Sequence, residues 1–576
     1  MHQYFHDLLR FVIQARPIYS QHTQSGPRRP LKIKRANSEV TDSKPISLLI
    51  IISFFSPQLN GVEIYVDNVI GNDSYDGLAK LVLPDNQGPF KTINAAIKKA
   101  GPGDTIQLIQ TGALYRQTAN FYGHKGGARG KPITLNGNGV TLSGADRCSA
   151  KGWSEWKDGI YMRRDKVSRV FLLVDGKMVF QQRAFNVIRP GEFCYMPDFF
   201  SRLYFYPPEG KKAEEFKIKV GQPGGAAVNL DPSVWHPSHS KIRAVRRYPG
   251  LKTPEWLELN GERVTLVTAK ERLSPGEWCL EDKVMYFRPS AGKTLNDLNV
   301  EAIIRINGVQ LTGNTSHIVV RNINAQHVYN DGFNIHGKVT GAEFYNCNAR
   351  QCGDEGFSSH DDCETILDGA VYEECDNGIA NVNVSGWSKT TNVFIRNSRS
   401  VGFLIANSVK QRHTLTNAIL VDNPSQFSGG YTVADNVLIV RSKDGPRTQA
   451  LNCKAEVSIG RLLAVGNSSL MRADGKSNVV IRNSLFGPAQ RVFHIRGDNP
   501  AEIVRFEHCI FSRDLHIEWG ARPPWRKAAV ADWLLSAQSK SVTGCAVKTF
   551  TANQSLTGYE GGCSEGLIEK YIRLIR

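Results

Sequence analysis

Two short segments in the middle of the chain carry acids and histidines in the same order. Asp331 to Gly337 reads DGFNIHG, and Glu355 to Glu364 reads EGFSSHDDCE, so the pattern acid, Gly-Phe, two residues, His recurs 24 residues later. If each repeat is one coil of a solenoid, equivalent residues stack at the strand spacing of ~4.8 Å. The spacing therefore predicts one site with paired carboxylates and paired histidines.

Paired carboxylates on adjacent coils are suited to acid/base and nucleophilic chemistry on a glycosidic bond. Carboxyl groups ~5 to 5.5 Å apart are typical of retaining glycosidases, and groups ~6.5 to 9.5 Å apart of inverting ones. Asp331 and Glu355 suit retention, one as nucleophile and the other as an acid/base with a raised pKa. Asp354, one position earlier, suits a wider pair. His336 and His360 complete the predicted catalytic set.

Strand alternation places a condition on this site. Asp331 and Glu355 are in phase with Phe333 and Phe357, which should face the core. A turn just before each strand would break that phase. The predicted site therefore requires such a turn.

The same segment also fits β-elimination from a uronate-containing polysaccharide. That reaction needs a base near the uronate α-proton and a means of neutralising the carboxylate, often Ca²⁺. The candidate bases are Lys338, Arg350, His336 and His360. Several carboxylates without a dedicated basic cluster favour hydrolysis over elimination. The side chains expected to bind substrate are Asn334, Lys338, Arg350 and Ser358.

An acidic insertion is predicted beside the second histidine. His336 and Cys347 are 11 residues apart, whereas His360 and Cys375, taken as their equivalents, are 15 apart. Insertions at coil turns of solenoids often carry function. Calcium is the one metal cofactor considered, and its expected ligands are Asp361, Asp362 and Glu364, with Asp354 as a further candidate.

The composition favours a soluble β-rich protein with a polyanionic partner. The chain has 576 residues, too many for one ordinary core, and it contains 52 glycines and 41% apolar residues. A formal charge of +17 favours nucleic acid, anionic membrane or acidic polysaccharide as a partner, with solubility as the alternative explanation. Because no nucleic-acid-binding module is recognisable, a polysaccharide, neutral or anionic, is the expected partner. We expect a monomer.

A regular coil pattern begins after residue 300 and predicts a main β-helix over 301–519. A glycine followed by an apolar residue recurs with steps of 24, 24, 22 and 24 residues, at Gly308, Gly332, Gly356, Gly378 and Gly402. Asn322, Asn346 and Asn397 share one place in a second strand series. Amides stacked one coil apart can hydrogen-bond into a ladder, so these asparagines are expected to be structural.

The first 60 residues are predicted to be a leader. Residues 46–56 form an apolar run of 11, the length of a signal-peptide core, and the alternative is a buried strand. Because the run lies deep in the chain, Val40 is a candidate start site. A secreted, periplasmic or cell-surface protein is expected. No other apolar run is long enough to cross a membrane.

Residues 61–149 carry the first resemblance to a known group. A strand (EIYVDN), a Gly/Asp turn and a short amphipathic helix over 92–100 are stopped by Gly101-Pro102-Gly103. This run resembles the N-terminal cap of right-handed parallel β-helix proteins of the pectin-lyase-like group, where a helix closes the end of the coil. PITLNGNGVTLSG (132–144) resembles the first coils. The resemblance implies an all-β, right-handed parallel β-helix.

Two other regions depart from the coil pattern. Residues 150–300 contain an internal duplication, in which 172–179 matches 257–264, and predict an inserted domain made of two small antiparallel β units. Residues 520–576 lose the period, include a helix near Trp533, and are expected to cap the last coil.

A narrower resemblance concerns the site itself. Residues 330–333 (NDGF) and 353–357 (GDEGF) look like the two acid-bearing motifs of the polygalacturonase family, although the next coil, DNGIANVNV, lacks its Gly-His-Gly, and no Arg-x-Lys partner is present. The arrangement is also similar to β-helix glycosidases, including β-xylosidases, that are interrupted by a β-sandwich and use an Asp and a Glu on neighbouring coils. Both imply a secreted polysaccharide-degrading hydrolase. A lyase and a non-catalytic polysaccharide-binding solenoid remain the alternatives.

Overall fold

The computed structural model describes residues 61–575 with short gaps. The predicted leader, with its apolar run at 46–56 and the start site at Val40, lies outside the described residues, so the signal peptide stays a prediction. The gaps within the chain are 124–125, 165–170, 191, 197–201, 208, 213–214, 216–217, 222–226, 231–235, 238–242, 246–255, 260–261, 265–267, 282–283, 407–412, 490–492, 536–541 and 551–562.

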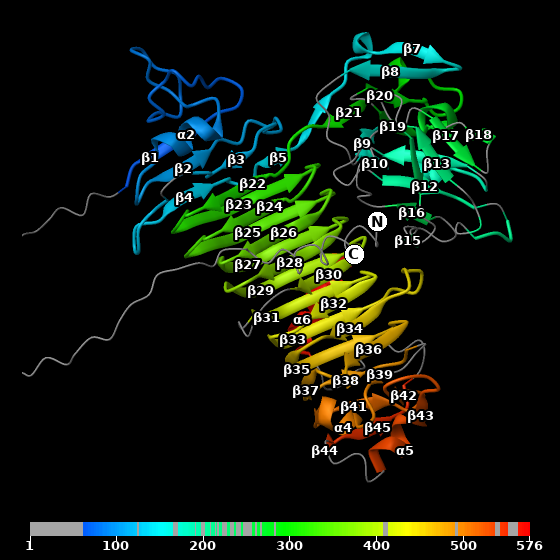
Figure 1. Cartoon of the computed structure of the whole chain (residues 1–576). Helices are drawn as coiled ribbons and strands as arrows, with labels where there is room; N and C mark the ends of the chain where they lie inside the picture. Colours follow the sequence, from blue (N-terminus) through cyan, green and yellow to red (C-terminus); the bar gives the residue numbers. More distant parts are fainter. Residues whose placement is uncertain are drawn as a thin grey trace, which may run out of the picture.

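The main body is a parallel β-helix in which two long sheets, here called sheet A and sheet B, enclose one core (Figure 1). The predicted fold class is confirmed. The described strands of sheet A are β1 (Glu63–Val66), β2 (Thr105–Leu108), β4 (Ile133–Asn136), β5 (Thr141–Ser143), β23 (Ile318–Gln326), β25 (Ala342–Arg350), β27 (Glu364–Glu373), β29 (Trp387–Arg396), β31 (His413–Val421), β33 (Thr432–Val440), β35 (Glu456–Val465), β37 (Asn478–Arg482), β38 (Leu485–Phe486), β40 (Val504–Glu507), β41 (Ile510–Ser512), β44 (Val542–Thr543) and β45 (Ala546–Lys548).

Sheet B carries the predicted site. Its strands are parallel apart from the last, β43, which runs antiparallel to β42. The described strands of sheet B are β3 (Ala119–Asn120), β22 (Val309–Gly313), β24 (Phe333–Gly337), β26 (Glu355–Asp361), β28 (Asn377–Asn383), β30 (Val401–Ile405), β32 (Ser425–Gly429), β34 (Gln449–Cys453), β36 (Ser469–Asp474), β39 (Phe493–Arg496), β42 (His516–Trp519) and β43 (Arg526–Ala529).

The Gly-apolar repeat sets the register of sheet B, as predicted. Phe333 pairs with Phe357 on the next coil, and Phe357 pairs with Ile379 on the one after. These side chains are buried in the common core, where Phe344 of sheet A packs edge-on against Phe333 and Phe357, with ring centroids 6.0 and 5.0 Å away. The alternate side chains of the strands therefore face outward and can line a groove.

The asparagine ladder is present, but one of its predicted members is wrong. Asn346 Nδ2 donates to Asn322 Oδ1 at 3.2 Å, and both residues have a positive φ, which asparagine tolerates at a bend. The later rung is Asn392, whose amide contacts Asp368 and Asn417. Gly369 holds the place between Asn346 and Asn392, and Asn397 lies in the next turn, because the residues that precede it pair as the strand after the bend.

The predicted acidic insertion is also wrong. Tyr345 pairs with Asp368 and Ala349 pairs with Tyr372, so Ala370 is the residue beside Cys347. Cys375, the residue that the sequence pattern aligns with Cys347, lies beyond the end of β27. The coil that contains Asp361, Asp362 and Glu364 is therefore not lengthened.

At the N-terminal end, α2 (Ile93–Lys99) packs against β1, β2 and β3 (Figure 1). Thr92 is its N-cap, since the Thr92 hydroxyl accepts a hydrogen bond from the Ala95 N–H at 3.3 Å. Ile93, Ala96 and Ile97 are buried in the solenoid core.

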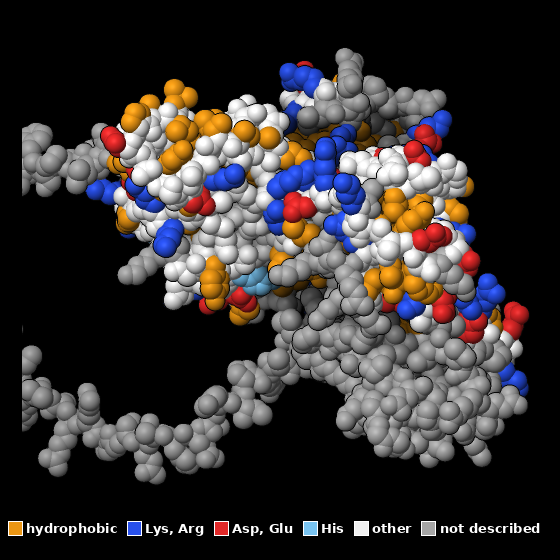
Figure 2. Space-filling model, turned by 90° about the horizontal axis from the view of Figure 1, so that it is seen from above, with side chains coloured by type: hydrophobic (Ala, Val, Ile, Leu, Met, Phe, Trp, Pro, Cys, Tyr) orange, Lys and Arg blue, Asp and Glu red, His pale blue; other side chains and the backbone are white. Residues whose placement is uncertain are grey.

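When the molecule is viewed from its N-terminal end, Lys and Arg side chains gather near the centre of the view (Figure 2).

Between β5 and β22 the chain forms short antiparallel sheets in a lobe beside the solenoid (Figure 1). Two of its hairpins begin with similar sequences, PGEFC (190–194) and PGEWC (275–279), and pair Cys194 with Tyr204 and Cys279 with Tyr286. The described elements are β6 (Ala145–Arg147), β7 (Ser154–Lys157), β8 (Ile160–Arg164), β9 (Phe171–Val174), β10 (Lys177–Phe180), α3 (Ala184–Val187), β11 (Phe193–Met196), β12 (Arg202–Phe205), β13 (Ile218–Gly221), β14 (Ala227–Leu230), β15 (His236–Pro237), β16 (Arg243–Val245), β17 (Trp256–Leu259), β18 (Glu262–Val264), β19 (Trp278–Glu281), β20 (Val284–Phe287) and β21 (Val300–Ile303), with short 3₁₀ turns at Ala150–Gly152, Lys270–Arg272 and Leu295–Asp297.

Three further described helices lie in the C-terminal part of the chain: α4 (Pro500–Ile503) between β39 and β40, α5 (Val530–Leu535) after β43, and α6 (Glu565–Ile575). The helix expected near Trp533 is α5, and its Trp533 ring packs on Phe506 of the core. By contrast, α6 does not cover the last coil. Its Leu567, Ile568 and Tyr571 are buried against β31 and β33, on the outer face of sheet A. Within the described residues, no helix has the length and apolar character that crossing a membrane would require.

Candidate active site

Three acids converge at the N-terminal ends of two neighbouring strands of sheet B, β24 and β26. Asp331 and Asp354 lie in the turns before β24 and β26, and Glu355 is the first residue of β26. One carboxylate oxygen from each lies within 4.8 Å of those of the other two. In the described part of the chain, this is the only such group of three or more potential metal ligands. The acids of the two repeated motifs are therefore brought together.

A break in alternation turns Asp331 away from the hydrophobic core. A Cβ placed on Gly332 would lie 2.5 Å from the Ala349 Cβ, which is in the core. Residues 332 and 333 therefore both face inward, and Asp331 faces the outer side of the sheet. There its carboxylate accepts a hydrogen bond from Asn334, an outward residue of β24. This is the turn that the predicted site requires.

The acids replace amides in a column of hydrogen-bonded side chains. The Asn307 Oδ1 accepts the Asp331 N–H at 3.1 Å, and the Asp331 Oδ1 accepts the Glu355 N–H at 3.1 Å. On the next coil, Asn377 donates to Glu355 at 2.9 Å and accepts the Val401 N–H at 3.1 Å. A neutral amide can thus make these contacts without burying a charge. The two acids cost stability that Asn would not, which makes them candidates for a chemical role.

Burial raises the pKa of all three carboxyl groups, and repulsion from neighbouring acids raises those of Asp354 and Glu355 further. For Asp331 and Glu355 the main cause is burial, and the pKa of Glu355 lies well above its ordinary value, with the charges of Asp354 and Asp331 adding to it. Burial and the charges of Asp331 and Asp376 raise the pKa of Asp354 to about 7. Glu355 is hydrogen-bonded to both Asp331 and Asp354. The cluster therefore retains protons near neutral pH.

The three acids differ in exposure. Asp331 and Glu355 are only 1% and 4% exposed, whereas Asp354 is half-buried. Asp354 is thus the member of the cluster whose surface is open to a ligand. A half-buried acid with a pKa of about 7 can donate or accept a proton at neutral pH.

The two histidines lie further along the same outer face. The rings of His336 and His360 are stacked, with centroids 4.1 Å apart and an interplanar angle of 10°. His360 also shares a hydrogen bond with Ser358, at 2.5 Å, on the outer face of β26. Burial and the neighbouring His336 lower the pKa of His360 to about 4, so its ring is neutral at physiological pH. Asn334, Ser358 and the histidine stack form one polar strip beside the acids.

The remaining predicted residues do not join the acid cluster. Lys338 is exposed beyond the far end of β24, and Arg350 is 3.9 and 3.6 Å from the carboxylates of Glu373 and Glu374. Asp361 contacts the His336 ring at 3.2 Å, and Asp362 accepts a hydrogen bond from Ser385. Glu364 begins β27 in sheet A. The expected calcium ligands Asp361, Asp362 and Glu364 thus have no common centre among the described residues.

Arg399 is a functional candidate that the sequence did not indicate. Its guanidinium donates to the carbonyls of Cys352 and Gly353 at 2.8 and 2.9 Å and lies 3.6 Å from Asp376. It also covers the ring of Phe180, from β10 of the lobe, at 5.1 Å. Arg399 therefore holds the turn that carries Asp354 and connects it to the lobe. The nearby Asn377 was detectable, because the Gly-apolar repeat aligns it with Glu355.

The raised pKa of Asp354 makes a prediction about stability. Because the folded state holds this proton up to about pH 7, while an unfolded aspartate loses it near pH ~4, stability should fall as pH rises between those values. We expect Asp354→Asn to raise Tm above that of the wild type at pH 8, with the difference disappearing below pH 5. Thermal melts across this range measure it.

The matched control is Asp444→Asn, which neutralises an exposed carboxylate on a later coil. It should leave the pH profile of Tm unchanged. A lower Tm for Asp354→Asn at pH 8 would show that the charged carboxylate stabilises the fold, contrary to this prediction.

Fold and site together define a parallel β-helix protein with converging carboxyl groups on adjacent coils. No protein-family model matches the chain, and no curated protein matches its sequence. Among solved structures, the complex of XylC with xylose matches with 12% identity and a TM-score of 0.38, over 84% of this chain and 83% of that one. A GH136 lacto-N-biosidase from Eubacterium ramulus matches with 10% identity and a TM-score of 0.31, over 85% of this chain and 68% of that one. At these scores the assignment of the fold rests on the strand pairing of the chain itself.

Proposed function

We propose that this protein is a glycoside hydrolase that cleaves a polysaccharide with retention of anomeric configuration. The observation that carries the proposal is the convergence of Asp331, Asp354 and Glu355, whose oxygens lie within 4.8 Å of one another on adjacent coils. Such a separation is near the ~5 to 5.5 Å of retaining enzymes and leaves no room for the water that an inverting pair activates.

The roles follow from the pKa of Asp354 and from the hydrogen bonds that Asp331 accepts. Asp354, half-buried with a pKa of about 7, protonates the departing glycosidic oxygen and later deprotonates the attacking water. Asp331, held by the Asn334 amide and the Glu355 N–H, is the nucleophile that bonds to the anomeric carbon. Glu355 stays protonated between them. Its hydrogen bonds to Asp331 and Asp354 make these two acids lose their protons at different pH values.

Elimination is supported less well by the same residues. Arg399 is the cation beside Asp354, but its guanidinium is bonded to backbone carbonyls and paired with Asp376. Lys338 and Arg350, the basic residues predicted from the sequence, do not contact the acid cluster in the described structure. The acids expected to bind calcium are likewise dispersed.

We propose further that the enzyme acts outside the cytoplasm, as the apolar segment at 46–56 suggests.

The proposal is tested by the products. A panel of neutral and anionic polysaccharides is incubated with the protein, and new reducing ends and ultraviolet absorbance are measured together. We expect reducing ends without the absorbance of an unsaturated uronate, and an unchanged rate in EDTA. New absorbance that disappears with EDTA would establish a calcium-dependent lyase instead. Glycan binding without either product would identify a non-catalytic solenoid.

A further inference from the structure

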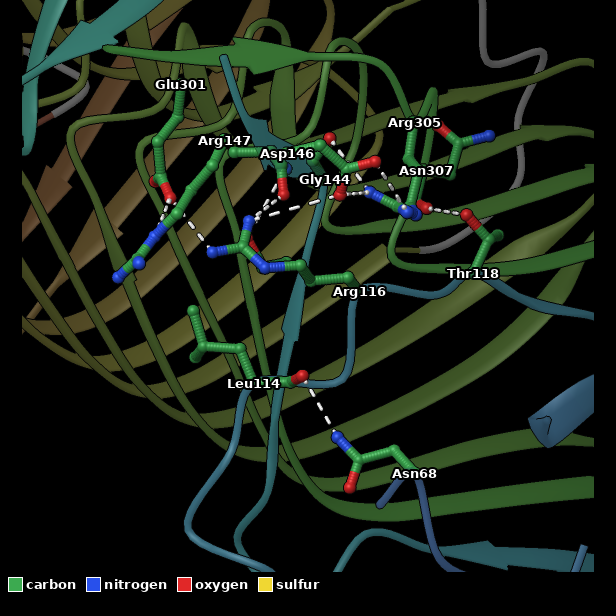
Figure 3. A network of polar contacts seen from close by, with 12 residues as sticks. Asn68, Leu114, Arg116, Thr118, Gly144, Asp146, Arg147, Glu301, Arg305 and Asn307 are labelled. Atoms are coloured by element: carbon green, nitrogen blue, oxygen red, sulfur yellow. Dashed lines mark hydrogen bonds and ion pairs between the residues drawn. The ribbon is translucent and has the colours of Figure 1, made fainter. Parts of the chain in front are cut away.

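A cleft of about 550 Å³ lies between the first coils and the base of the lobe. Its lining joins the segment before β3 to β6, and consists of Ala113, Leu114, Arg116, Asp146 and Arg147. Figure 3 shows Leu114, Arg116, Asp146 and Arg147 with Glu301 and Arg305, which extend the polar network on the lobe side. None of the three acids of the proposed active site lines this cleft.

The polar network in this cleft has more positive than negative groups. Arg305 pairs with Asp146 at 2.8 Å, and Arg116 pairs with Glu301 at 2.9 Å. Arg147 adds a third guanidinium, 3.9 Å from the same Glu301 carboxylate, and its side chain is 78% exposed. Both carboxylates are thus already paired with an arginine. The surplus positive charge therefore lies on the exposed Arg147, next to Arg116, whose guanidinium also donates to the Ala145 carbonyl.

The cleft contacts the coil that directly precedes the coil of Asp331. The Arg305 carbonyl accepts the Tyr329 N–H at 2.9 Å, and the Asn307 Oδ1 accepts the Asp331 N–H at 3.1 Å. The Thr118 hydroxyl donates to the Asn307 carbonyl at 2.8 Å, which ties the cleft wall to this coil (Figure 3). Because neighbouring coils are ~4.8 Å apart, a glycan held at the acids can extend into the cleft.

We infer that Arg116 and Arg147 form a subsite for an anionic substituent of the glycan, a carboxylate or a sulfate. A guanidinium presents a planar fork of N–H donors that matches such an oxyanion. Leu114, which is 39% exposed, supplies apolar surface against which a sugar ring can lie. The subsite rests on the proposed function, because it assumes that the groove binds a polysaccharide, and it narrows the substrate to an acidic one.

Binding, measured without turnover, tests the subsite. The full chain is titrated with polygalacturonate and with its carboxyl-reduced neutral form, and separately with dextran sulfate and dextran. We expect the wild type to prefer one anionic polymer over its neutral counterpart by about 10-fold, since several charge-assisted contacts are gained. Preference within the first pair identifies a carboxylate, and preference within the second a sulfate.

The variants separate this subsite from general attraction to a basic protein. Arg147→Gln should weaken binding of the preferred anionic polymer by about 3- to 10-fold, and Arg116→Gln by more, because Arg116 is less exposed. Arg505→Gln, at an exposed residue of β40 near the opposite end of the solenoid, makes the same charge change and should alter binding less than 2-fold. Thermal melts show whether each variant is folded.

Equal losses for Arg147→Gln and Arg505→Gln, or equal binding of charged and neutral polymers, would overturn the subsite. Cleavage of a neutral glycan with no anionic preference would leave the hydrolase proposal standing and remove the subsite alone. Conversely, an anionic preference that depends on Arg147 without any cleavage would keep the subsite and remove the hydrolase. The two proposals therefore fail separately.

Discussion

Asp354→Asn is expected to lower kcat by about 100- to 10,000-fold on a natural glycan, because the departing oxygen loses its proton donor. The pKa of Asp354 is about 7, so the wild-type rate should fall above that pH as the acid becomes deprotonated. The variant should lose this alkaline decline. Both effects are read from the pH dependence of kcat and kcat/KM on the best substrate of the polysaccharide panel.

The leaving group distinguishes a lost proton donor from general damage. An aryl glycoside of the sugar that the wild type releases, with a phenol that leaves without protonation, should be attacked by Asp354→Asn at a rate much closer to that of the wild type. Subsequent hydrolysis of the covalent intermediate stays slow, because the same residue activates the water. A burst of phenol followed by slow turnover is therefore expected.

Asp362→Asn is the matched control for Asp354→Asn. Asp362 is exposed and bonded to Ser385 beyond the end of β26, so a hydrolase that uses the acid cluster should keep its full kcat. A large loss in Asp362→Asn would favour the calcium-binding role first predicted for this residue. Equal losses of Asp354→Asn on natural and activated substrates would remove Asp354 as the acid.

The solenoid and its register could be predicted from the sequence because each coil repeats one local rule. Gly332 and Gly356 stand where a Cβ would enter the core, and the following phenylalanines fill that core, so the periodicity itself encodes the stacking. The wrong assignments come from segments in which similar residue types occur on different strands. Asn397 and Cys375 were matched by residue type, and only the strand pairing shows that Asn392 and Ala370 occupy those places.

The site was predictable in its members but not in its arrangement. The repeat named Asp331, Asp354 and Glu355, yet the break in alternation at Gly332 and the lower exposure of Glu355 depend on packing between coils. Arg399 was beyond the reach of sequence, because its partners at 352–353 and Phe180 are brought to it by the lobe and by two different coils. Long-range contacts of this kind leave no periodic signal.

Asp331→Asn is expected to abolish turnover, with a loss of about 10,000-fold or more, while the protein stays folded. The reason for expecting a folded variant is structural: Asn307 and Asn377 occupy the same column, and the Asn377 amide oxygen accepts the N–H of the following coil as Asp331 does. The amide therefore keeps the hydrogen bond and removes a buried charge. Measurement of kcat on one preparation checks the loss of turnover, and Tm measured on the same preparation checks that the variant is folded.

The covalent step supplies the decisive readout for Asp331. A 2-deoxy-2-fluoro glycoside of the released sugar, with a good leaving group, should form a bond from its anomeric carbon to the Asp331 carboxylate as the leaving group departs. Peptide mapping by mass spectrometry should find this adduct in the wild type and not in Asp331→Asn. An adduct on Glu355, or more than a hundredth of the wild-type kcat in Asp331→Asn, would contradict the assignment. Since burial and the charges of Asp354 and Asp331 raise the pKa of Glu355 well above its usual range, Glu355 stays protonated and we expect it to remain unlabelled.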